Sequence, residues 1–134
     1  MMKIKQRNIV DHEAESAYVL RRVELNHREL SEGQSPWSIR QTAVYHKLHS
    51  ARNPTESTTN NEEVSKLRWQ STFLFLAPSD NFQQQLGEYL MLNVPSGDVS
   101  PWELHRQIIA DSLENWLDYM AHLEEEMRKE VRDS

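Results

Sequence analysis

The sequence predicts an α+β fold: a small antiparallel sheet packed by helices, with a long helix at the C-terminal end. Two segments, near residues 37–48 and 67–77, are rich in β-branched and aromatic residues, which suit a half-buried sheet. A polar run between them predicts a flexible loop at 49–65 and antiparallel strands, since parallel pairing needs a longer crossover. From Pro101 to about Val131, neither glycine nor proline interrupts the helical pattern.

Length and composition set the broad class of protein. A chain of 134 residues predicts one domain, residues 1–134. The absence of cysteine excludes a disulfide framework and thiolate metal sites, and the net charge of −6 argues against binding to nucleic acid. No apolar run approaches the ~20 residues that span a bilayer, and the basic N-terminus lacks the apolar segment of a secretory signal. We expect a soluble, cytoplasmic chain.

The segment from Asp11 to Leu30 predicts a helix. Apolar residues are spaced three to four positions apart, beginning with the residue just before the segment: Val10, Ala14, Ala17 and Tyr18. Gly33 and Pro36 suit the end of this helix, because glycine favours the left-handed backbone of a helix stop and proline favours extended backbone before it.

The strand near 67–77 is apolar on both faces at its end. Phe73 and Phe75 point one way and Leu74 and Leu76 the other, which predicts that both faces are covered. After it, Ser79 is placed to cap a helix that ends near Asn93. The apolar face of that helix consists of Phe82, Leu86, Tyr89 and Leu90.

The last helix begins with a capping box, Ser100 to Glu103, that has proline at the first helical position. A stalk-like helix over 101–131 would be roughly 45 Å long. Its apolar positions have heptad-like spacing: Ile109, Leu113, Trp116, Met120, Leu123 and Met127. We expect the first half to pack on the sheet and the second to project and self-associate, with Leu113, Met120, Leu123 and Met127 at the interface.

Three blocks carry a resemblance to a known family. The run Pro36 to Lys47 contains a Trp-Ser-Ile-Arg-Gln-Thr strand, Leu74 to Ser79 forms a hydrophobic strand with a Pro-Ser turn, and a Leu-His segment precedes Asn-Trp-x-x-Tyr at Asn115 to Tyr119. In this order the blocks resemble the fungal CorA-like transporter domain, over roughly Tyr18 to Glu130. The signature positions are Trp37, Arg40, Gln41, Tyr45, His46, Trp116 and Tyr119.

The family is similar to the cytoplasmic part of CorA-type magnesium channels. The resemblance implies an α/β domain that feeds a long stalk helix, and a pentameric assembly whose pore carries Gly-Met-Asn. This sequence has neither that motif nor a membrane segment, so the chain as given is not expected to conduct ions. A regulatory-domain fragment of a longer protein with a membrane-embedded segment, a truncated gene model and a stand-alone relative all remain open.

Several acidic and histidine residues are candidates for metal binding. The resemblance points to carboxylates of the last helix, Asp118, Glu124 and Glu125, as possible ligands of Mg²⁺, which prefers oxygen. Two further candidate groups are His12 with Glu13 and Glu15, and His46 with His49. For each group, the alternative is an ordinary solvated surface.

The polar signature residues also have a structural interpretation. We expect Arg40 to pair with a carboxylate on a covering helix, beside Gln41, and Trp116 and Tyr119 to pack against the strand at 73–76. No nucleophile elbow or glycine-rich phosphate loop occurs, so an enzyme is not expected; a remote possibility is a site of His and carboxylates beside Arg40.

Two functional hypotheses follow. The first is a soluble regulatory or assembly domain of a CorA-like divalent-cation transporter, possibly with Mg²⁺ as ligand. The alternative is a free-standing helical module that oligomerises through the last helix and has no transport role. Self-association through the last helix is common to both.

Overall fold

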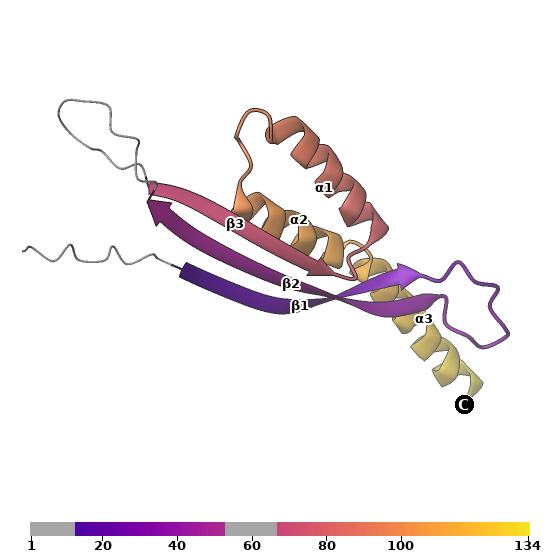
Figure 1. Cartoon of the computed structure of the whole chain (residues 1–134). Helices are drawn as coiled ribbons and strands as arrows, with labels where there is room; N and C mark the ends of the chain where they lie inside the picture. The colour runs from indigo at the N-terminus through magenta and orange to yellow at the C-terminus, as the bar shows by residue number, and fades with distance from the viewer. Residues whose placement is uncertain (1–12, 53–66) are drawn as a thin grey trace, which may run out of the picture. The chain divides into compact units, whose positions relative to one another are not determined.

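The computed structural model describes residues 13–52 and 67–134. The elements follow in the order β1 (Glu13–Leu25), β2 (Trp37–Arg52), β3 (Leu67–Leu76), α1 (Asp80–Asn93), α2 (Pro101–Leu113) and α3 (Trp116–Asp133). The strands form one sheet in the order β1-β2-β3, and neighbouring strands run in opposite directions (Figure 1). The predicted α+β fold is therefore confirmed.

By its internal contacts the chain divides into two compact units, which are described separately. The first contains residues 1–17 and 45–74, and the second contains residues 18–44 and 75–134. All three helices belong to the second unit.

The predicted helix over Asp11–Leu30 is wrong, because the described part of this segment contains strand β1. Exposure alternates along it: Tyr18, Leu20 and Arg22 are covered, whereas Val19 and Arg21 between them are exposed. This period of two is that of a strand with one covered face. Gly33 lies in the turn between β1 and β2, with a φ of 86° that glycine adopts without strain.

The two predicted strands are confirmed, with one change in length. β2 continues to Arg52, so the first residues of the expected loop at 49–65 belong to the strand, and 53–66 lie outside the described residues. On β3 only one face is covered: Phe73 and Phe75 are half-buried, whereas Leu74 and Leu76 are exposed. The expectation that both faces of β3 are covered is therefore wrong. In the described residues, α1 contacts the face of β3 that carries Phe75, and the face that carries Leu74 and Leu76 is exposed.

Helix α1 begins as predicted. The Ser79 hydroxyl accepts a hydrogen bond of 3.0 Å from the backbone N–H of Phe82, so it caps the free end of the helix. Phe82 is completely buried, and its ring meets the edge of Phe75 at a centroid distance of 4.9 Å. This aromatic pair fixes α1 against the end of β3.

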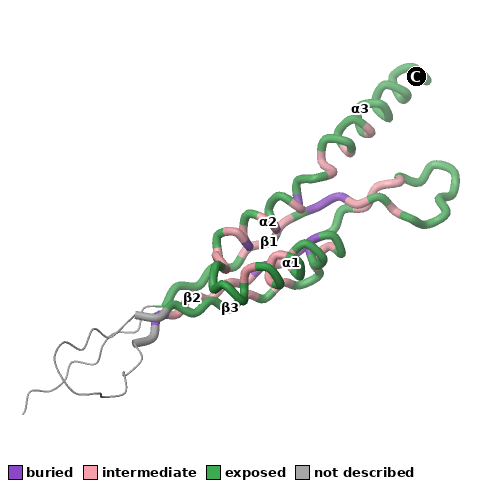
Figure 2. Tube along the Cα trace, turned by 90° about the horizontal axis from the view of Figure 1, so that it is seen from above, coloured by how far each residue is buried: buried purple, intermediate pink, exposed green. Residues whose placement is uncertain are grey.

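The core of the second unit is small. Its buried apolar side chains are Val23, Val44, Phe82, Leu104 and Ile108, from β1, β2, α1 and α2. Among the described residues, the buried positions lie on these elements and none lies on α3 (Figure 2). Burial of apolar area in this core is the main term that holds α1 and α2 on the strands.

The start of α2 differs in detail from the predicted capping box. Pro101 is the first helical residue, but the Ser100 side chain makes no cap hydrogen bond. The backbone N–H of Ser100 donates to the Tyr89 hydroxyl at 3.0 Å, while the Glu103 carboxylate accepts from Arg106 and Gln107. Because Tyr89 satisfies the amide that Glu103 would bind, α1 rather than a capping box fixes the start of α2.

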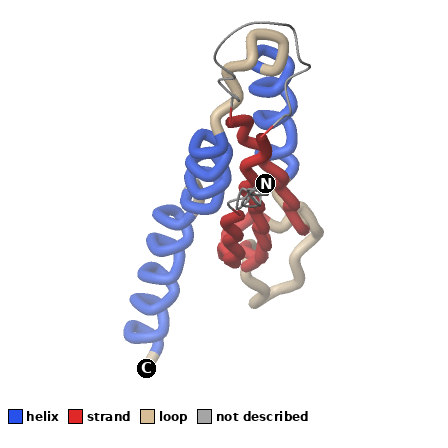
Figure 3. Tube along the Cα trace, turned by 60° about the vertical axis from the view of Figure 1, so that its left-hand side comes forward, coloured by secondary structure: helices blue, strands red, loops and turns tan. Residues whose placement is uncertain are grey.

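The predicted continuous helix over 101–131 is bent into α2 and α3 at Glu114–Asn115 (Figure 3). The Asn115 side-chain amide donates to the Val23 carbonyl of β1 at 3.1 Å. Asn115 has φ −100° and ψ 3°, outside helical values. The hydrogen bond to β1 therefore holds the chain at the point where the helical backbone is interrupted.

Candidate assembly interface on the C-terminal helix

The first turn of α3 is fixed to the strands of its unit. The Trp116 indole N–H donates to the Arg21 carbonyl of β1 at 3.2 Å. Tyr119 meets the edge of the Trp37 ring of β2 at a centroid distance of 6.1 Å. These contacts go to β1 and β2 rather than to the predicted partner strand at 73–76. Two signature aromatics, Trp37 and Tyr119, thus join the start of α3 to the sheet.

Beyond this turn, α3 presents an exposed line of apolar side chains. The α3 stripe consists of Met120 (57% exposed), Leu123 (38%), Met127 (67%) and Val131 (75%). At 3.6 residues per turn these four positions lie within an arc of about 80°. No residue of α3 is buried. A contiguous exposed apolar patch of this kind is typical of an interaction surface.

Three ion pairs within the helix lie on α3 outside the stripe. Arg128 donates to Glu124 at 2.6 Å, Lys129 to Glu126 at 2.9 Å and Arg132 to Glu125 at 3.1 Å. The hydrogen bond from Lys129 lowers the pKa of Glu126, and the same bond raises the pKa of Lys129. Such exposed pairs stabilise a helix only slightly, but they keep its polar face solvated.

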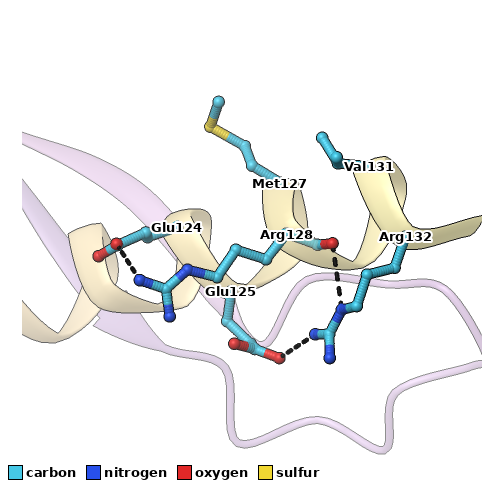
Figure 4. A pocket seen from close by; sticks show the side chains of 6 residues that line it. All are labelled: Glu124, Glu125, Met127, Arg128, Val131 and Arg132. Atoms are coloured by element: carbon cyan, nitrogen blue, oxygen red, sulfur yellow. Dashed lines mark hydrogen bonds and ion pairs between the residues drawn. The ribbon is translucent and has the colours of Figure 1, made fainter.

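The two kinds of surface meet in a shallow depression on α3 (Figure 4). Met127 and Val131 project on one side, away from the paired side chains of Glu124, Glu125, Arg128 and Arg132. The ion pairs therefore leave the stripe open. Leu113, the remaining interface candidate, is exposed but belongs to α2, across the bend from Met120.

Two of the three metal-ligand candidates on α3, Glu124 and Glu125, are engaged with cations. Glu124 pairs with Arg128 and Glu125 with Arg132, and Asp118 lies two turns before Glu125. In residues 13–52 and 67–134, no group of three or more His, Asp or Glu side chains is placed to hold a metal ion. A Mg²⁺ ion at Glu124 or Glu125 would have to compete with an arginine.

The candidates in the first unit form cross-strand pairs. Lys47 Nζ lies 3.3 Å from Glu13 and 3.7 Å from Glu15, and His49 Nδ1 lies 3.2 Å from Glu13. The pKa of Lys47 is raised mainly by its hydrogen bond to Glu13. These contacts are ordinary links between β1 and β2. His12, the third member of the predicted acidic group, lies outside the described residues.

His46 and Tyr45, two further signature residues, interact with different strands. The His46 ring stacks on Phe73 at a centroid distance of 4.0 Å, and its Nε2 lies 3.3 Å from the Ser71 hydroxyl. The pKa of Tyr45 is raised, first by burial and then by the Glu15 carboxylate. Since His46 contacts β3 and His49 contacts β1, these two histidines are not brought together as a metal pair.

Arg40 and Gln41 are exposed on β2. Arg40 Nε lies 3.9 Å from Glu24, which is the carboxylate partner that the sequence predicts, but on a strand instead of a helix. At that distance and exposure the pair contributes little to stability. The Arg40–Gln41 part of the signature therefore has a weak structural role in this unit.

The buried cation of this unit is Arg22, which the sequence analysis did not single out. Its guanidinium donates to the Thr42 hydroxyl, to the Ala77 carbonyl at 2.9 Å and to Glu24 at 2.7 Å. A helical interpretation of residues 11–30 does not place Arg22 on a buried face. Alternation with Tyr18 and Leu20 is the signal that places Arg22 on the covered face of a strand.

A polar groove of about 360 Å³ lies beside Arg22. It is bordered by Ser79 and Asn81 of the α1 start and by Asp111 and Glu114 of the α2 end. The Ser79 hydroxyl lies 2.7 and 2.8 Å from the two Asp111 oxygens, and the Asn81 amide donates to both acids. These bonds join the α1 start to the α2 end.

Comparison with known families identifies the group to which this chain belongs. The model of the CorA-like transporters matches residues 1–76, more than half of the chain. The chain belongs to the CorA-like transporter family. The match includes β1, β2 and β3, whereas the third block at Asn115 to Tyr119 lies beyond it.

The other comparisons gave no relatives. No curated protein and no solved structure matches the chain. Across the described ranges, 13–52 and 67–134, each helix is too short or too polar to cross a lipid bilayer.

Proposed function

We propose that this chain is a regulatory or assembly domain of the CorA-like transporter family, and that its copies associate through the α3 stripe. The observation that carries the proposal is the stripe itself, four apolar side chains on a helix without a buried residue. Family membership supplies the context of a transporter.

The geometry of α3 supports an interface for another helix. Met120, Leu123 and Met127 follow one another at intervals of three and four residues, the spacing that aligns side chains along a helix–helix seam. Covering them would remove apolar surface from water, which is the main favourable term in association. Trp116 anchors the start of the helix, so less conformational freedom is lost when a partner docks.

A double substitution tests this proposal. Met120→Glu with Leu123→Glu places two charges in the middle of the stripe, and burying them against an apolar partner would be costly. We expect the wild-type chain to associate in a concentration series and the variant to stay at the 15.8 kDa of one chain, by light scattering. The control, Ala121→Glu with Gln85→Glu, adds the same charge at exposed positions off the stripe and should associate like the wild type.

The regulatory part of the proposal has its own experiment. Mg²⁺ is titrated into the chain by calorimetry, with Ca²⁺ as control, while light scattering follows the mass. Saturable binding of Mg²⁺ that changes the mass would support a cation-sensing domain. Association that is indifferent to Mg²⁺ would limit the role to assembly.

A free-standing oligomerisation module is the second candidate function. The α3 stripe favours it as well, because a second copy could cover these side chains without a membrane segment or a bound cation. Stalk helices that continue into one membrane would run in the same direction. The orientation of the paired helices therefore separates the two candidates.

A further inference from the structure

We infer that α2 and α3 are two parts of one helix, which contacts with β1 hold in a bent form and which can straighten at Asn115. This inference goes beyond the proposed self-association, because it concerns the shape of a single copy. Two independent observations carry it: an apolar pattern that continues through the bend, and side-chain contacts that fix the bend from outside the helix.

The sequence on both sides of the bend is that of one continuous helix. After Pro101, neither glycine nor proline occurs before the last residue, Ser134. On a straight helix, apolar residues that alternate spacings of four and three positions form a single seam. This spacing continues without a change across 114–115, in the seam of Ile109, Leu113, Trp116, Met120, Leu123 and Met127.

Asn115 gives a local reason for a break, because asparagine is a favourable N-cap. In the structure, however, its side chain makes no cap hydrogen bond to α3. The side-chain amide donates instead to the Val23 carbonyl of β1, at 3.1 Å. In a helix interior, asparagine is only slightly less favourable than most other residues. The break is therefore stabilised by β1 rather than by a cap of α3.

The interruption of the helical backbone is confined to one residue. Glu114 has φ −54° and ψ −47°, which are helical values, and Trp116 is the first residue of α3. Asn115 has φ −100° and ψ 3°. Rotating these two dihedrals by about 40° each gives the values of an α-helix. A small local change thus separates the bent helix from a straight one (Figure 3).

Two consecutive residues make the hydrogen bonds that hold the bend. The Trp116 indole N–H donates to the Arg21 carbonyl at 3.2 Å, next to the bond from Asn115 to Val23. Strand β1 is an outer strand of the sheet, so carbonyls on its free edge are available to other elements. Straightening would redirect α3 while α2 stays packed on the strands, so it competes with these two bonds.

The bent form divides the apolar seam. Leu113 is 61% exposed on α2 and Met120 is 57% exposed on α3, while Trp116 between them is bound to β1. In the straight form the seam runs without interruption over 109–127, about 27 Å, against about 16 Å for the α3 stripe. A partner that covers the whole seam would therefore favour the straight form, whereas the bonds to β1 favour the bent one.

A distance measured across the bend tests this inference, and the chain has no native cysteine to interfere with labelling. Spin labels are attached to Ala110→Cys and Arg128→Cys, two exposed positions separated by 18 residues. On a straight helix this is five full turns, so the labels lie on one side about 27 Å apart. We expect the wild-type background to depart from this distance. Asn115→Leu with Trp116→Phe removes both donors and should bring the main distance to about 27 Å; an unchanged distance would overturn the inference.

The matched control is Glu114→Leu with Trp102→Phe. It introduces the same two residue types but leaves both bonds to β1, so it should keep the wild-type distance. A control that straightens equally would overturn the inference, because helix propensity alone would then explain the change. The labelled chain is diluted until light scattering gives the 15.8 kDa of one copy. The hinge is thus tested without self-association: an unchanged distance leaves the proposed function standing, and a chain that never associates leaves the hinge standing.

Amide exchange at Leu117 and Asp118 provides a second measurement without labels. The first amides of a helix have no partner within it, and the Asn115 side chain caps none of them in α3. In a straight helix these two amides would donate to the carbonyls of Leu113 and Glu114. We expect their exchange, followed by NMR, to be several-fold slower in the variant without the two donors than in the wild type. Equal rates would contradict straightening.

Discussion

The guanidinium of Arg22, on β1, donates a hydrogen bond of 2.9 Å to the backbone carbonyl of Ala77, directly after β3. Thr42, on the central strand β2, also donates to this carbonyl, at 3.1 Å. Ala77 has a φ of 51°, in the left-handed region that is unfavourable for a residue with a Cβ. Arg22 and Thr42 therefore hold the turn that directs the chain from β3 into α1.

Replacing Arg22 with methionine should destabilise the fold. The substitution keeps apolar volume but leaves the Ala77 carbonyl and the Thr42 hydroxyl without their charged donor. We expect a loss of about 2–3 kcal/mol in the free energy of unfolding, measured by urea denaturation. Arg21→Met is the matched control: its side chain is exposed, so a change within about 0.5 kcal/mol is expected. Equal losses for the two variants would contradict the role of Arg22.

Replacing Ala77 with glycine should stabilise the protein or leave it unchanged. Glycine adopts a φ of 51° without strain, which gains about 1–2 kcal/mol, but it adds about 0.5–1 kcal/mol of entropy to the unfolded chain. The expected net gain lies between about 0 and 1.5 kcal/mol, by thermal or urea unfolding. Ala43→Gly, within strand β2, should instead lose about 0.5–1 kcal/mol. A marked loss of stability in the Ala77→Gly variant would show that the backbone of Ala77 is not strained.

The burial of His105 should make the stability of the protein depend on pH. The Tyr18 hydroxyl lies 2.5 Å from His105 Nδ1, and burial lowers the pKa of His105 below its ordinary value of 6.5. The unfolded chain therefore takes up this proton first as the pH falls. Stability is complete above pH 6.5 and decreases as the pH drops toward the folded-state pKa.

Urea unfolding at a series of pH values tests this linkage. His105→Asn should remove part of the loss between about pH 7 and pH 5, the range in which histidine titrates. His27→Asn, at an exposed loop position, should leave the loss unchanged. Identical pH profiles for the wild type and His105→Asn would be inconsistent with the proposed coupling.

The elements whose determinants are local were predictable from the sequence. Ser79 caps α1 as expected, because a serine before a helical apolar pattern needs only its own neighbours to act. The strand β3 and the exposed positions of the last helix were also evident from composition and spacing.

The elements that depend on contacts between distant parts of the chain were not predictable from the sequence. Tyr18 and Leu20 fit a helical face as well as a strand face, and only pairing with β2 selects the strand. The bend at Asn115 depends on the Val23 carbonyl, which lies 92 positions earlier. Arg22 is buried because Thr42 and Ala77 surround it, and no local pattern specifies those partners.

The central claim is that the α3 stripe joins copies of this chain. The most direct test is sedimentation velocity of the wild type and of Met120→Glu with Leu123→Glu across a concentration series. We predict a wild-type coefficient that rises with concentration toward that of a dimer, and a variant that stays at the monomer value. A wild type that remains monomeric throughout, or a variant that associates equally well, would contradict the account.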